Sequence, residues 1–151
     1  MKYVTRPLAL FCGLFLSMSA LAAQSDPLVA QIDAYIVTTD PDSAEVLELA
    51  EVANPGDIIL YRATFKNQSD TALTAVQPVI PIPAGLEYIE GSAKPAPQEV
   101  SLDGITFESL SAVNASGEPV DTTAFRALRW SIDALESDVP FTAELRARLV
   151  Q

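Results

Sequence analysis

A strict alternation of apolar and polar side chains near the C-terminus constrains this chain most. Residues 141–149 read FTAELRARL, which places Phe141, Leu145 and Leu149 on one side of an extended chain. Residues 59–66 (ILYRATFK) repeat the pattern with Tyr61 and Phe65. Successive side chains of a strand point to opposite faces, so both segments predict β-strands with one buried and one wet face.

The rest of the chain also favours strands over helices. Ten of its 11 prolines lie scattered beyond residue 22, and proline interrupts helices. Residues 31–39 predict a first strand, and Asp103-Gly104 predicts a two-residue hairpin between residues 99–102 and 105–110. Residues 44–53 fit a helical stripe and show no clean strand alternation, but the neighbouring strands favour the extended form. We therefore expect an all-β antiparallel sandwich, with Trp130 also in its core.

The N-terminus has the three parts of a secretory signal peptide in order. Lys2 and Arg6 precede the apolar run of residues 8–16, and Ala20-Leu21-Ala22 gives a small-x-small cleavage pattern. The apolar run is about half the ~20 residues that a spanning helix needs. We expect residues 1–22 to be removed, residues 23–30 to form a leader, and residues 31–151 to form one domain in the periplasm or outside the cell.

Charge and cysteine content then limit the partners. Loss of Lys2 and Arg6 leaves seven basic residues against 20 acidic ones, a net charge of −13. Such a surface repels nucleic acid, and no second segment predicts a membrane span, so we expect a soluble monomer whose partner is an envelope or surface protein or a glycan. The single cysteine, Cys12, leaves with the signal, so disulfides cannot stabilise the domain.

Four short motifs, in order, resemble the bacterial conserved-repeat domain known as domain of unknown function eleven. They are residues 54–70 (NPGDIILYRATFKNQSD), 83–92 (PAGLEYIEGS), 128–132 (LRWSI) and 139–150 (VPFTAELRARLV). The resemblance covers roughly residues 45–151. It departs from the family where residues 79–82 (VIPI) replace a stretch that usually carries an aspartate.

The resemblance implies an immunoglobulin-like β-sandwich of a bacterial surface or envelope, usually present in tandem copies. This chain holds a single copy without an internal repeat. It therefore resembles a free-standing module.

The residue types argue against common catalytic sites. Nucleophilic catalysis needs a base beside the nucleophile, and the sequence has no histidine and no cysteine after the signal. Zinc and copper sites draw on the same two residue types. We therefore expect neither an enzyme nor a cofactor.

Calcium is the one ion with suitable ligands close together in sequence. Asp40, Asp42 and Glu45 surround a turn and offer carboxylate oxygens. The cluster lacks the twelve-residue loop spacing and its central glycine, which favours a solvated acidic turn over a metal site.

The long polar loop of residues 111–123 is a candidate contact surface, because loops carry much of the binding in rigid scaffolds. Its candidate residues are Asn114, Ser116, Glu118 and Asp121, a composition that also suits a merely solvated loop.

Three function classes follow. The leading hypothesis is a non-catalytic exported envelope module that binds or scaffolds. The first alternative is a pilus-like or fibre subunit assembled by strand exchange, against which the well-patterned last strand counts. The second alternative is a hydrolase with an unrecognised carboxylate site.

Overall fold

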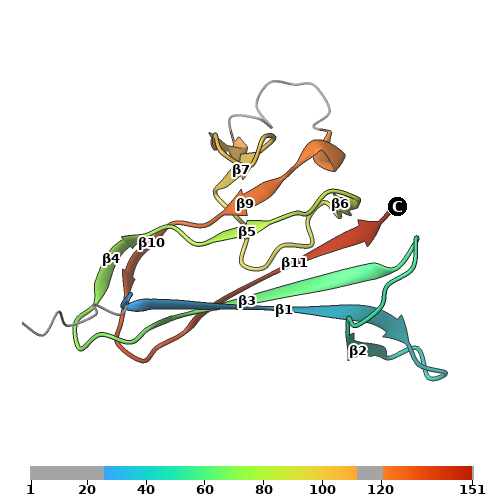
Figure 1. Ribbon diagram of the computed structural model, residues 1–151, viewed down its shortest axis with the longest axis horizontal. Helices are drawn as coiled ribbons and strands as arrows, with labels where there is room; N and C mark the ends of the chain where they lie inside the picture. The colour runs from blue at the N-terminus through green and yellow to red at the C-terminus, as the bar shows by residue number, and fades with distance from the viewer. Residues whose placement is uncertain (1–25, 112–120, 151) are drawn as a thin grey trace, which may run out of the picture.

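A computed structural model describes residues 26–111 and 121–150 of the chain (Figure 1). They form antiparallel strands and one short 3-10 helix, η1 (Thr122–Ala124). The strands are β1 (Leu28–Thr39), β2 (Glu45–Leu49), β3 (Ile58–Asn67), β4 (Leu73–Val76), β5 (Val79–Pro81), β6 (Leu86–Tyr88), β7 (Glu99–Ser101), β8 (Glu108–Ser109), β9 (Ala127–Arg129), β10 (Ile132–Leu135) and β11 (Phe141–Leu149). The expected all-β antiparallel sandwich is confirmed.

The first layer is a five-stranded sheet in the order β2-β1-β3-β11-β6. Its centre is the pairing of β3 with β11, the two segments with the clearest alternation. Within the segment 44–53, residues Glu45–Leu49 form β2, so the extended form is confirmed for these five residues, whereas residues 50–53 lie outside any strand. β1 begins at Leu28, which lies opposite Asn67 of β3. Residues 28–30, which were expected to belong to the leader of residues 23–30, are therefore part of the first strand.

The second layer combines a four-stranded sheet, β5-β9-β7-β8, with the two-stranded β4–β10 pair. One register runs through β4–β10 and β5–β9, from Leu135 opposite Leu73 to Ala127 opposite Pro81. Between them the Trp130 amide donates to the Pro78 carbonyl at 2.9 Å. Pro78 has no N–H to return that bond, which interrupts the ladder without shifting the register.

The core lies between the two layers, and small residues let the layers approach. Ala63, Ala143 and Ala147 are fully buried on the inner face of β3 and β11. Opposite them lie Leu128 and Trp130, 0% and 1% exposed. The Trp130 indole N–H donates to the Pro95 carbonyl at 2.7 Å, so the one polar group of this large side chain is satisfied.

The expected core residues split into two groups. Phe65, Trp130 and Leu145 are buried, as their positions in the alternation predict. Tyr61, Phe141 and Leu149 are only half-buried, packed against the margin of the core. Alternation identifies the inward face, but it does not say how far the opposite layer extends over it.

The two-residue hairpin at Asp103-Gly104 is wrong. β7 and β8 do pair, with Glu99 opposite Ser109, but residues 102–107 connect them. The Asp103 carboxylate accepts bonds from the Ile105 and Thr106 amides, both at 2.7 Å, which folds a wider loop. The bond from the Thr106 hydroxyl, at 2.7 Å, and then these two amide bonds hold the pKa of Asp103 well below its usual value.

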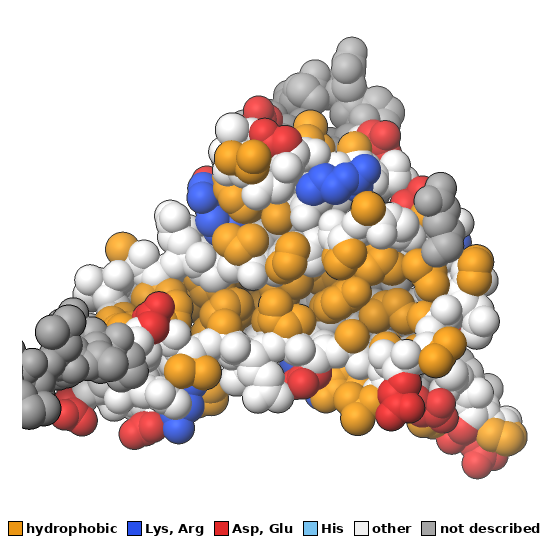
Figure 2. All heavy atoms as spheres, viewed as in Figure 1, with side chains coloured by type: hydrophobic (Ala, Val, Ile, Leu, Met, Phe, Trp, Pro, Cys, Tyr) orange, Lys and Arg blue, Asp and Glu red, His pale blue; other side chains and the backbone are white. Residues whose placement is uncertain are grey.

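Among the described residues, the sandwich is open along one side. An apolar band is visible between the two layers, above the edge formed by β1 (Figure 2). Ile32 points to the inner face of β1, in register with buried Ala63, yet it is 44% exposed. The second layer therefore does not fully cover the inner face of β1.

Candidate binding surface

The calcium candidates do not converge on one point. The Asp40 Oδ1 accepts the amides of Asp42 at 3.0 Å and Ala44 at 2.8 Å, which makes it a turn-stabilising acceptor. Glu45 points elsewhere and binds the Arg146 guanidinium. Within residues 26–111 and 121–150, no group of three acidic side chains is placed to hold a metal ion.

The candidate contact loop is described only at its two ends, Ser111 and residues 121–123. Asp121 caps η1 through its Oδ1, which accepts the Thr123 amide at 3.1 Å. Asn114, Ser116 and Glu118 lie outside the described residues. Asp121 therefore has a local structural role, and the contact hypothesis for the loop stays a prediction.

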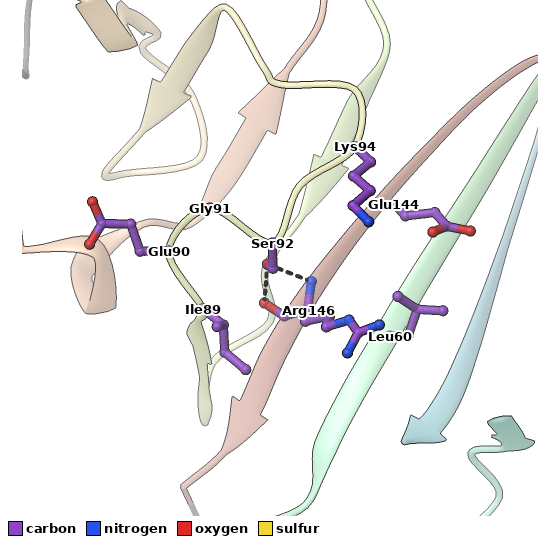
Figure 3. A pocket seen from close by; sticks show the side chains of 8 residues that line it. All are labelled: Leu60, Ile89, Glu90, Gly91, Ser92, Lys94, Glu144 and Arg146. Carbon is purple, nitrogen blue, oxygen red and sulfur yellow. Dashed lines mark hydrogen bonds between the residues drawn. The ribbon is translucent and has the colours of Figure 1, made fainter. Parts of the chain in front are cut away.

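A concave site lies instead beside β11, where the strand meets the segment that follows β6. We call it the cationic hollow, and its volume is about 420 Å³. It is lined by Leu60, Ile89, Glu90, Gly91, Ser92, Lys94, Glu144 and Arg146. In Figure 3 the Lys94, Glu144 and Arg146 side chains gather on one side, whereas Glu90 points away from them.

A bulge in the edge of the sheet creates this hollow. The Ile89 amide donates to the Arg146 carbonyl at 2.9 Å, after which the chain leaves β11. It returns at Lys94, which exchanges backbone bonds of 2.9 and 2.7 Å with Glu144. Extra residues on one strand of an antiparallel pair bend that strand and redirect its side chains.

The Ser92 side chain replaces the missing backbone partner inside the bulge. Its hydroxyl accepts the Arg146 amide at 3.0 Å and donates to the Arg146 carbonyl at 3.2 Å (Figure 3). Gly91 has a φ of +71°, a conformation that costs little only for glycine. The bulge is thus a hydrogen-bonded structure that fixes where Lys94 re-enters the sheet.

Two ion pairs organise the charges around the hollow. The Arg146 guanidinium binds Glu45 with both nitrogens, Nη1–Oε2 at 2.7 Å and Nη2–Oε1 at 2.8 Å. The Arg62 Nε lies 2.6 Å from the Glu144 Oε1, and the Arg62 guanidinium stacks 5.2 Å from the Tyr35 ring centroid. Lys94 makes no ion pair within the described part of the chain.

The pKa shifts have matching causes. The pKa of Glu45 is lowered, first by its hydrogen bonds to Arg146 and further by the charges of Arg146 and Lys94. The pKa of Arg62 is raised chiefly by its bond to Glu144. Arg146 and Lys94, the two cations of the hollow, therefore both favour the ionised form of the Glu45 carboxylate.

Basic residues are concentrated on this side of an otherwise acidic protein. Arg62 and Lys66 alternate with buried residues of β3, and Arg146 and Arg148 alternate with buried residues of β11. These four residues therefore share the outward face of the sheet, and Lys94 lies at its margin opposite Glu144. Five of the seven basic residues beyond the expected signal lie here.

A second feature is the free edge of β1. The Ala34 carbonyl accepts the Ala50 amide, so even-numbered residues of β1 direct their backbone groups toward the β2 side. β2 pairs with β1 only from Tyr35 onward. The backbone groups of Ala30 and Ile32 therefore face no other strand among those described.

Sequence patterns did not reveal either feature. Lys94 precedes a proline and is typical of a bend, and Glu45 is separated from Arg146 by 101 residues. The alternation of β11 does place Arg146 outward, which is the one local signal of the hollow.

Comparison of the chain with known protein families, with curated proteins and with solved structures found no match. No helix among the described residues is long and apolar enough to cross a membrane.

Proposed function

We propose that this protein is an exported, non-catalytic module of a bacterial cell envelope that binds another envelope molecule through the cationic hollow. The observation that supports the proposal is the pairing of Lys94 and Arg146 around a hollow on an acidic domain. Lys94 makes no ion pair among the described residues, and a cation of this kind can attract and orient a negatively charged group. The hydrogen-bonded bulge fixes the backbone from which Lys94 and Arg146 project, and preorganisation of this kind lowers the entropic cost of binding.

The export part of the proposal rests on the signal-peptide pattern of residues 1–22. The resemblance of residues 54–70 and 83–92 to the conserved-repeat domain is an independent reason to place the protein in an envelope. Export and membership of the conserved-repeat family are both hypotheses. The assignment of the sandwich to the immunoglobulin-like subclass is a third hypothesis, because it rests on the same resemblance.

Affinity capture from an envelope extract tests the binding role. The bait is the chain from Ala23 onward, compared with a Lys94→Gln/Arg146→Gln double variant and an Arg148→Gln control. Arg148 lies two residues along the same outward face and does not line the hollow. We expect the double variant to lose the captured molecule and the control to retain it; equal capture by all three would reject the hollow as the contact.

The free edge of β1 favours a second candidate, a subunit that assembles by pairing this edge with a strand of another copy. The edge segment, residues 28–33, carries neither proline nor lysine, the residues that usually prevent edge pairing. The edge of β5, by contrast, carries Pro81 and follows Pro78. Against this candidate, β11 is already present as an inner strand, so the sheet does not lack its own last strand.

Light scattering after size exclusion tests the second candidate. Self-assembly predicts a mass above that of one chain, which Ala30→Pro reduces by removing an edge N–H. A single-chain mass at every concentration would exclude it.

A further inference from the structure

We propose that the cationic hollow recognises an acidic peptide segment of a partner protein, whose side-chain carboxylate takes the place of Glu45 on Arg146. This inference rests on the proposed binding role and names the ligand class for the same site. In this scheme Glu45 is an internal competitor that occupies the position when no partner is bound.

The geometry of the Glu45–Arg146 pair supports this assignment. A bidentate contact between guanidinium and carboxylate matches the two planar groups and selects carboxylates by shape as well as charge. The pair is open to solvent, with 33% of the Arg146 and 45% of the Glu45 side chain exposed. An incoming carboxylate can therefore reach Arg146 without disturbing the core.

Lys94 is the cation of the hollow that makes no ion pair among the described residues, whereas Arg146 is paired with Glu45. Glu144 is engaged by Arg62, and Glu90 points away from the cations (Figure 3). A ligand with two neighbouring carboxylates would neutralise both cations, whereas Glu45 neutralises one.

A peptide fits the site better than a sugar acid because the occupant already present is a peptide side chain. Glu45 is the first residue of β2, an edge strand, and it presents its carboxylate from an extended backbone. Ile89, which is half-buried, lines the hollow and offers apolar surface to the methylene groups of an acidic side chain. A partner strand carrying glutamates would reproduce both contacts.

The internal competitor has to be weak for this exchange to occur. Exposed ion pairs contribute little to stability, because water screens them and two long side chains must be ordered. Removal of Glu45 should therefore tighten binding by about 1.4- to 5-fold, the range that exposed pairs span. Binding should weaken as salt is raised.

The experiment measures fluorescence anisotropy of a labelled hexaglutamate peptide titrated with the chain from Ala23 onward. A hexaglutamine peptide is the uncharged control, and trigalacturonate is the sugar-acid competitor. Protein variants are Glu45→Gln, Arg146→Gln, Arg146→Lys and, as the matched control, Arg148→Gln. Circular dichroism of each variant verifies that the fold is retained.

We expect hexaglutamate alone to bind, Glu45→Gln to tighten binding, Arg146→Gln to abolish it and Arg148→Gln to leave it unchanged. Arg146→Lys keeps the charge without the bidentate fork, so binding should fall even though the fold is intact. Absence of peptide binding, or a Glu45→Gln variant no tighter than the parent, overturns the inference. Binding of trigalacturonate in place of the peptide also overturns it.

The two proposals fail differently. Capture from the envelope extract that needs Lys94 and Arg146, combined with no peptide binding, rejects the ligand class and keeps the binding role. Capture that ignores both residues rejects the binding role itself.

Discussion

Trp130 gives the sharpest test of the packing described above. It is 1% exposed, and its indole N–H donates to the Pro95 carbonyl at 2.7 Å. Truncating a buried tryptophan to alanine costs about 3–5 kcal/mol through lost transfer energy and the cavity left behind. Because a domain has about 5–15 kcal/mol in total, Trp130→Ala should lose a large share of the free energy of unfolding.

The variant Trp130→Phe separates packing from hydrogen bonding. Phenylalanine retains most of the ring but removes the bond to the carbonyl of Pro95, an exposed residue, and losing a typical hydrogen bond costs about 0.5–1.5 kcal/mol. Urea unfolding followed by far-UV circular dichroism measures both variants, because the protein has no other tryptophan for fluorescence. Arg148→Ala, on the exposed face, should change stability by no more than about 0.5 kcal/mol. Equal losses for Trp130→Ala and Arg148→Ala would refute the assignment of inner and outer faces.

Three further predictions concern acid, calcium and processing. The hydrogen bond from Arg129 lowers the pKa of Glu99 below its reference value of 4.5. Ionised Glu99 therefore stabilises the fold at neutral pH, and this contribution disappears as the pH falls through the lowered pKa. The urea midpoints of the parent and of Glu99→Gln should accordingly differ at neutral pH and converge in acid. Millimolar calcium should shift the melting temperature no more than magnesium does, and a calcium-selective rise abolished by Asp42→Ala would contradict the placement of Asp40 as a turn acceptor. Mass spectrometry of the exported protein should find Ala23 at the N-terminus, and a product that begins at Met1 would reject the signal peptide.

Features that depend on local patterns could be predicted from the sequence. β3 and β11 follow from alternation, because the pleat of a strand imposes a period of two on any chain with one buried face. Features that depend on contacts distant in sequence could not. The half-burial of Tyr61 depends on where the opposite layer ends, and no neighbour of Tyr61 in sequence encodes that boundary.

The turn after β7 shows a second limit. Asp103-Gly104 has the composition of a two-residue hairpin, and Gly104 does take a positive φ of 80°. The Asp103 carboxylate nevertheless binds the amides two and three residues onward, together with the Ser101 and Thr106 hydroxyls. Side-chain acceptors of this kind compete with the backbone ladder, so the dipeptide alone does not decide the length of a loop.

The two faces of β11 explain why binding and stability can be tested separately in this protein. The inner residues Ala143, Leu145 and Ala147 are fully buried, so changes there alter core packing. The outer residues Glu144 and Arg146 form open ion pairs, whose loss costs only about 0.2–1 kcal/mol each. A substitution at Arg146 that abolishes binding should therefore leave the urea midpoint nearly unchanged, whereas one at Leu145 should reduce both together. Because adjacent residues of one strand are predicted to behave so differently, the comparison of Arg146→Gln with Leu145→Ala tests the fold and the proposed site in the same measurement.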